Sequence, residues 1–327
     1  MFFHEKRRQQ FLTETAYKGT KLFFEEQAAP SYLEALSRTD FDALDRSMNA
    51  DNYADESFTT FMLRYTAGEP LTTLREDLDH IIFAYEQAAR YVQVSEKDPT
   101  FPPLRFIEID EYERVLQLIG LCFLLHRREL LPRIAAMFDP SSEGRDMLYE
   151  DLLAFEIDGR AEVDRWFHEN PYRTLIDCLF AETDQEVIAG LEHYLTIWYK
   201  SLSDSPWHDS HLYIEGDICA GYFGYWAIES AALTYLMKVD DKSFREHLVY
   251  PKDLVDFAKK MDDTQGLKAD QLRTRLRVAG GMPCPKSGYW MTPALLDSRQ
   301  LFKMDDVMPI YAQSAYGATI WQWSEEQ

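Results

Sequence analysis

The sequence of 327 residues holds little of what enzyme and metal sites usually require. Its four cysteines lie far apart and form no C-x-x-C pair. This spacing excludes the common zinc patterns and a disulfide framework, and it favours buried thiols in a reducing compartment. The sequence also lacks a P-loop and the motifs G-x-G-x-x-G, G-x-S-x-G and H-E-x-x-H. We therefore expect no catalytic residue, no metal and no cofactor.

Long apolar runs are missing as well. The longest, residues 116–125, is interrupted by Gln117 and falls short of the ~20 residues that a membrane span needs. The first residues, MFFHEKRRQQFLTE, lack the apolar segment and the cleavage site of a secretory signal. The sequence therefore predicts a cytoplasmic protein that does not associate with membranes.

Basic residues are scarce relative to acidic ones. There are 34 Lys and Arg against 56 Asp and Glu, which gives a net charge of −22. From Gln271 onward six basic residues face five acidic ones, whereas the preceding part has 28 against 51. Because nucleic-acid phosphates require Lys and Arg, we expect no direct binding of nucleic acid. The acidic charge instead suits attraction to a basic partner.

The first 270 residues show helical periods and almost no strand-like alternation. Residues 71–94 carry a stripe that includes Leu74, Leu78 and Ile81, which predicts a long amphipathic helix. Residues 221–236 are apolar on nearly every side, which predicts a helix surrounded by other helices. Further helices are expected over residues 161–167, 173–181, 185–201 and 242–248.

The composition of the sequence changes near residue 270. Residues 278–293 contain three glycines and three prolines, which break helices, and residues 289–292 and 318–323 are short strand candidates. We expect a mainly α protein in two parts. An acidic, all-helical, bundle-like domain covers residues 1–270, and a small Gly/Pro/Trp-rich β module, residues 271–327, docks on it because it is too small to fold comfortably alone.

Glu229 is the single acidic residue of the apolar segment 221–236. A buried carboxylate needs a partner or a shifted pKa. It could be a catalytic acid, or a structural carboxylate bonded to a helix end, an Arg or a Tyr. We favour the structural role because no second acid stands in a fixed frame beside it.

A short His-rich stretch leaves two interpretations open. On one helical face, His208, His211 and Glu215 could ligate a transition metal. The neighbouring Asp209 and Ser210 are instead typical of a helix start, where they cap free N–H groups, and we favour that interpretation.

One acidic stretch is a candidate footprint for a basic partner. It is strongly charged, because Arg46 is the one cation among six acids between residues 40 and 56, although a solvated face would look the same. We predict the partner-binding residues to be Asp40, Asp42, Asp45, Asp51, Asp55 and Glu56, joined by Asp209, Glu215 and Asp217 further along the chain.

Several elements of the sequence are similar to those of one known family. Leu63-Arg-Tyr-Thr-Ala-Gly-Glu-Pro70 resembles an element in the N-terminal part of the PoNi immunity proteins, antidotes that protect bacteria against their own DNase toxins. Their C-terminal part is matched in order by Tyr194-Leu-x-x-Trp198-Tyr199, by Gly224-Tyr-Trp-x-x-Glu229 and by Tyr250-Pro-Lys-Asp-Leu254. The tail is not part of that core, and it looks like C-terminal modules of other toxin-immunity proteins.

The resemblance implies an all-helical protein that binds a cognate toxin, a basic nuclease of a type VI or related secretion system, and occludes its active site. It carries over no catalytic residue, and a homodimer stays open. The motif residues that it implies to be structural are Tyr65, Gly68, Glu69, Trp198, Gly224, Tyr225, Trp226 and Glu229.

Two other functions remain as alternatives. The abundant aromatic residues and scattered carboxylates would also suit a carbohydrate-active enzyme on a helical toroid, which needs two carboxyl groups in a deep pocket. An adaptor that loads an effector onto secretion machinery would show the same acidic charge without neutralising a toxin.

Overall fold

The computed structural model describes residues 2–265, 276–292, 294–295, 297–311 and 319–324. Over these residues the chain is mainly helical with a small sheet, which confirms the predicted fold class. The helices are α1 (Phe3–Lys6), α2 (Glu14–Phe23), α3 (Ala29–Ser37), α4 (Ala43–Thr66), α5 (Leu71–Glu96), α6 (Ile109–Leu124), α7 (Leu131–Ser142), α8 (Met147–Leu153), α9 (Arg173–Phe180), α10 (Asp184–Ser201), α11 (Ile228–Leu236) and α12 (Lys252–Gln265). None of these is both long and apolar enough to cross a membrane.

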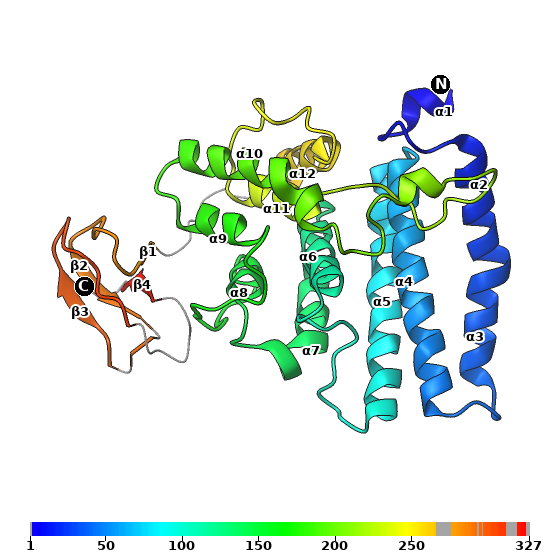
Figure 1. Ribbon diagram of the computed structural model, residues 1–327, viewed down its shortest axis with the longest axis horizontal. Helices are drawn as coiled ribbons and strands as arrows, with labels where there is room; N and C mark the ends of the chain where they lie inside the picture. The colour runs from blue at the N-terminus through cyan, green and yellow to red at the C-terminus, as the bar shows by residue number, and fades with distance from the viewer. Residues whose placement is uncertain (1, 266–275, 293, 296, 312–318, 325–327) are drawn as a thin grey trace.

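Helices α2 to α5 lie side by side at one end of the molecule (Figure 1). A π-helical turn, Phe24–Ala28, joins α2 to α3, directly before Pro30. Proline has no backbone N–H, and its ring clashes with the carbonyl four residues earlier in a regular α-helix. The wider π-helical turn therefore allows the helical segment to continue from α2 into α3.

Helix α4 starts and stops at residues with clear capping chemistry. Asp42 and Asp45 form a capping box, in which each carboxylate accepts the other residue's backbone N–H. The helix ends just before Gly68, whose φ is +87°, and a Cβ there would lie 2.1 Å from the carbonyl oxygen of Lys6. Only glycine fits this turn into α5.

The centre of the body is formed by α6 and α11, which pack against each other. Most side chains of α6 are buried, and so is every side chain of α11. At Gly120 a Cβ would lie 3.0 Å from the Ile228 side chain, so the small residue permits a close approach of the two helices. The helices around this pair bury its remaining faces (Figure 1).

The predicted helix over residues 221–236 is wrong in its first half. Helix α11 begins only at Ile228, and the segment before it is irregular, with Gly224 at a φ of +109°. A regular helix is not needed here because two side chains form hydrogen bonds with backbone groups of this segment. Thr66 Oγ1 donates to the carbonyl of Phe223 at 2.6 Å, and the Gln9 amide both accepts from and donates to the backbone of Tyr225.

Two other predicted helices are also absent from the described chain. Residues 161–167 run along the start of α8, where Met147 N donates to Arg165 O and Phe167 N donates to Asp146 Oδ2. Their backbone groups are therefore used across the chain rather than within a helix. Residues 242–248 form successive turns. The predicted helices over residues 71–94, 173–181 and 185–201 are confirmed as α5, α9 and α10.

The sheet lies at the far end from α2–α5 (Figure 1). Its strands are antiparallel in the order β1-β4-β2-β3, namely β1 (Arg277–Ala279), β2 (Gly288–Met291), β3 (Gln300–Phe302) and β4 (Ile320–Trp323). Trp290 and Trp321 form the centre of its own small core. Ile320 packs into the main core, and Arg277 pairs with Asp151 of α8. The predicted boundary near residue 270 falls outside the described residues.

Candidate functional site

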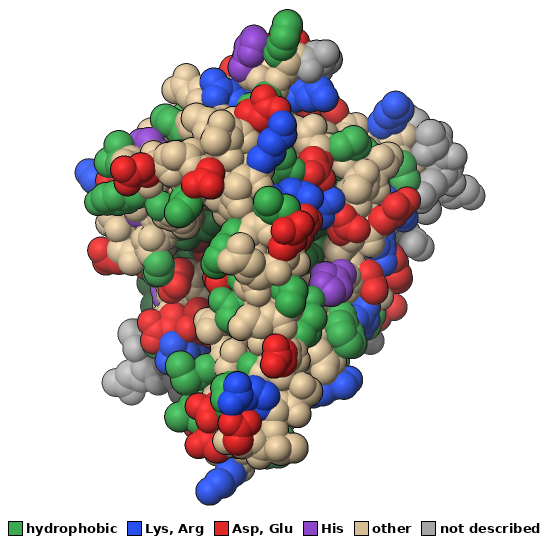
Figure 2. All heavy atoms as spheres, turned by 90° about the vertical axis from the view of Figure 1, so that its right-hand side faces the viewer, with side chains coloured by type: hydrophobic (Ala, Val, Ile, Leu, Met, Phe, Trp, Pro, Cys, Tyr) green, Lys and Arg blue, Asp and Glu red, His purple; other side chains and the backbone are tan. Residues whose placement is uncertain are grey.

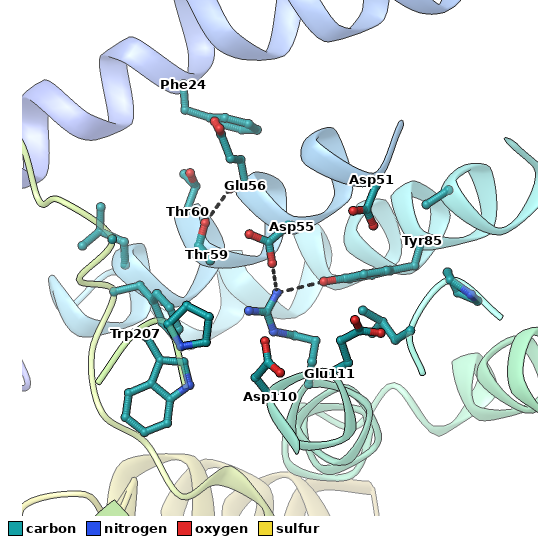
Figure 3. A pocket seen from close by; sticks show the side chains of 18 of the residues that line it. Phe24, Asp51, Asp55, Glu56, Thr59, Thr60, Tyr85, Asp110, Glu111 and Trp207 are labelled. Atoms are coloured by element: carbon teal, nitrogen blue, oxygen red, sulfur yellow. Dashed lines mark hydrogen bonds and ion pairs between the residues drawn. The ribbon is translucent and has the colours of Figure 1, made fainter. Parts of the chain in front are cut away.

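A cleft of about 710 Å³ opens between the α2–α5 bundle and the rest of the body (Figure 3). One wall is a face of α4, with Tyr85 of α5 behind it. The other wall is formed by residues 101–105, by the first turn of α6 and by residues 206–207 and 218–223. These segments are far apart in the sequence, so the cleft exists only in the folded chain.

The α4 wall is a single helical face. Met48, Asp51, Asp55 and Thr59 follow one another at steps of three or four residues, which places them above one another on the helix surface. Opposite them, Asp110 and Glu111 lie in the first turn of α6, where negative charge is favoured by the helix dipole.

Two guanidinium groups line the cleft, and both are already paired. Arg114 donates to Asp55 at 2.6 Å and to the Tyr85 hydroxyl at 2.9 Å, as the dashed lines in Figure 3 show. It also lies over the ring of Phe58, 4.1 Å from its centre. Arg105 donates to Glu111 at 2.8 Å. Because five carboxylates and two guanidinium groups line the cleft, its lining has an excess of negative charge.

Among the acids of the cleft, the carboxyl group of Asp51 has a raised pKa. Partial removal from water, followed by the carboxylates of Asp55 and Glu111, raises the pKa of Asp51 to about 6. Arg114 and Arg105 oppose that rise without cancelling it. A carboxyl crowded by like charges gains from an incoming cation, because the cation removes the repulsion.

The predicted partner-binding residues do not all meet at this cleft. Asp51, Asp55 and Glu56 line it. The other six do not, and several have local roles: Asp42 and Asp45 cap α4, Asp40 pairs with Arg38, and Asp209 accepts a hydrogen bond from Tyr199 at 2.7 Å. Asp110 and Glu111 are not among the predicted residues, although two acids at the start of a helix are visible in the sequence.

Most of the motif residues lie in the interior, and Gly68 and Glu69 are partly buried. Tyr65, Trp198, Tyr225, Trp226 and Glu229 are all buried. Tyr65 donates to Asp253 of α12, and Trp226 Nε1 donates to Thr66 Oγ1 at 2.8 Å. Gly68 and Gly224 have positive φ, and Glu69 accepts from Arg64 at 2.7 Å. These contacts hold elements together.

A second acid does stand near Glu229. Glu113 of α6 is buried, accepts from Trp207 Nε1 at 2.9 Å, and interacts electrostatically with Glu229. Burial, followed by the Glu229 carboxylate, raises the pKa of Glu113 well above its ordinary value. Neither carboxylate lines the cleft. Within the described residues, no group of three His, Cys, Asp or Glu side chains is placed to hold a metal ion.

Comparison with known proteins identifies the C-terminal half of the helical body. Residues 144–254 match the family model described as PoNe immunity proteins (PoNi), C-terminal. The resemblance seen in the sequence is thereby confirmed for this region, and the chain is PoNi-like there. Such a relation implies an immunity protein that binds a cognate toxin. The element Leu63–Pro70 lies outside the matched residues.

A solved structure supports the fold. The chain is similar to the protein PA2201 from Pseudomonas aeruginosa, with a TM-score of 0.60 and 21% sequence identity. The match covers 79% of this chain and 92% of that chain. At this identity the likeness shows the shared fold and nothing of function. Among curated proteins no match was found.

Proposed function

We propose that this chain is an immunity protein that neutralises a cognate antibacterial DNase of a type VI or related secretion system. The observation that carries the proposal is the match of residues 144–254 to the PoNi C-terminal region. The chain would act in the cytoplasm of the cell that makes both proteins, as a stoichiometric inhibitor that covers the active site of the toxin.

The charge supports inhibition by binding. Nuclease toxins need basic surfaces to hold DNA, and this chain has a net charge of −22, concentrated before residue 271. Opposite charges accelerate the encounter of two proteins, and an antidote must capture its toxin before DNA is cut. The protein can therefore work without a catalytic step of its own.

The test uses the product of the neighbouring gene. We expect the two purified proteins to form a 1:1 complex on gel filtration and DNA cleavage to stop at equimolar ratio. A stable complex that still cleaves DNA would refute inhibition. An effector-loading adaptor would give a different result in cells, because cells that lack this chain would export poorly but survive.

A carbohydrate-active enzyme remains a second candidate, favoured by one observation. Several carboxylates face one open cleft, and Asp51 has a pKa of about 6, which suits a general acid. Incubation of the purified chain with a panel of oligosaccharides decides this. Hydrolysis that Asp51→Asn abolishes would support the enzyme, and no product would leave the immunity function alone.

A further inference from the structure

We propose that the cleft between α4, the start of α6 and residues 206–207 and 218–223 receives a lysine or arginine side chain of the partner, presented on a segment with apolar neighbours. The inference rests on the proposed function, which supplies a basic protein as the partner. It names the part of this chain that would make the decisive contact.

The cleft has more carboxylates than guanidinium groups to pair with them. Asp55 and Glu111 are engaged by Arg114 and Arg105. Asp51 and Asp110 line the same cleft, and neither makes a hydrogen bond or an ion pair with any part of the chain that the structure describes. An incoming ammonium or guanidinium group carries three or five N–H donors and would find these acceptors free.

Two hydroxyl groups of the α4 wall are available to a ligand. Ser47 and Thr60 both line the cleft, and these residues are 7% and 8% exposed. Neither hydroxyl has a hydrogen-bond partner within the described residues. Hydroxyl oxygens that face a cleft can accept from a donor group of a ligand.

Part of the edge of the cleft is apolar. Phe23, Met48 and Ile218 line it, and each is more than half exposed. Figure 2 views the molecule from the α2–α5 end, where exposed hydrophobic side chains stand among carboxylates. Lysine and arginine bury their alkyl stems on apolar surface while the charged group reaches polar partners. Apolar surface around a polar centre is also typical of the energetically dominant part of a protein interface.

A protein partner fits this cleft better than a bare cation does. A metal ion would need several oxygen ligands close together, and the described residues hold no such group of three side chains. It would also leave the exposed hydrophobic side chains uncovered. A peptide segment with one basic and several apolar side chains uses the carboxylates, the hydroxyls and the hydrophobic edge together.

The variant Asp51→Asn/Asp110→Asn tests the inference without removing either side chain. We expect its affinity for the toxin from the neighbouring gene to fall by about 10- to 100-fold, because charged hydrogen bonds across the interface are lost. The matched control is Glu76→Gln/Glu192→Gln, which neutralises two exposed carboxylates outside the cleft. The control should stay within about twofold of the unchanged protein, since such rim charges contribute little. Equal affinities of the two double variants would overturn the proposal.

A synthetic probe separates this inference from the proposed function. The peptide acetyl-Leu-Arg-Leu-Lys-Leu-amide is titrated against the full chain and followed by NMR, with a glutamate-containing analogue as the negative comparison. One outcome is that the toxin does not bind this chain, while the basic peptide binds the unchanged protein and the control variant but not the cleft variant. The proposed function would then be wrong and the cleft assignment would stand. If the basic peptide binds the cleft variant and the control variant equally, the assignment fails.

Discussion

The indole nitrogen of Trp198 donates to the Glu229 carboxylate across 2.7 Å in the centre of the helical body. Tyr194 donates to the same oxygen at 2.5 Å. The other carboxylate oxygen is buried and has no partner among the described residues. These bonds tie α10 to α11. We therefore propose a structural role for Glu229, resting on its bonds to Tyr194 and Trp198 rather than on the absence of a second acid, since Glu113 lies near it.

Glu229 makes the stability of the protein depend on pH. Burial raises the pKa of Glu229 from 4.5 to about 7, although the bonds from Tyr194 and Trp198 act in the opposite direction. Between these two values the folded protein keeps a proton that the unfolded chain has released. The free energy of unfolding therefore falls as pH rises through this window, by about 3 kcal/mol from this group.

In the variant Glu229→Gln, the free energy of unfolding should not show this fall with rising pH. We expect the free energy of unfolding of the unchanged protein to fall by about 3 kcal/mol more than that of the variant between pH 4.5 and 8. Urea unfolding followed by circular dichroism at several pH values measures both curves. The pKa of Glu113 is raised partly by Glu229, so the Glu113 contribution shrinks in the variant and the difference between the two proteins keeps its sign. Parallel curves would contradict the assignment to Glu229.

Gly224→Ala should destabilise the fold strongly. A Cβ at this position would lie 2.1 Å from Thr66 Oγ1, and the φ of +109° is unfavourable for any other residue. We expect a loss of more than about 2 kcal/mol, measured by thermal unfolding. Gly216→Ala is the matched control, since its φ is also positive but no atom lies within 4 Å. It should cost only about 1 kcal/mol, and equal losses would show that packing at Gly224 does not matter.

Arg277→Ala should loosen the sheet from the helical body. Arg277 pairs with Asp151, and both side chains are 9% exposed. The variant removes the guanidinium group that Asp151 faces, and losing one partner of a buried pair costs up to about 3–5 kcal/mol. Hydrogen exchange should accelerate in β1 and β4 of the variant. Lys242→Ala breaks the exposed pair with Asp240 and serves as the control, in which exchange should not change.

The four cysteines should resist thiol reagents in the folded protein. Cys122, Cys178, Cys219 and Cys284 are free and buried. Burial raises the pKa of each thiol, which lowers the fraction of reactive thiolate. We expect a colorimetric thiol assay to find none without denaturant and four in denaturant. Rapid reaction of one thiol in the native protein would contradict the structure at that site.

Local sequence patterns anticipated much of the fold. The 3.6-residue period of α5 is a short-range signal, and α5 and α10 both form where helices are predicted. In the structure, Thr183 caps the start of α10. The prediction of a helix before Ile228 is wrong because Thr66 and Gln9, from distant parts of the chain, make hydrogen bonds to the backbone of this segment. Propensity alone contains no information about such partners.

The amino-acid sequence by itself determined the helical class, the excess of acid before residue 271, the buried thiols and the PoNi-like elements, since each depends on composition or on neighbours along the chain. Tertiary structure alone decided which acids share a cleft. Asp51 and Asp110 are 59 positions apart, and α4 and α6 must pack in one particular arrangement before their charges interact. Charge is a property of residues, whereas a binding site is a property of the distances between them.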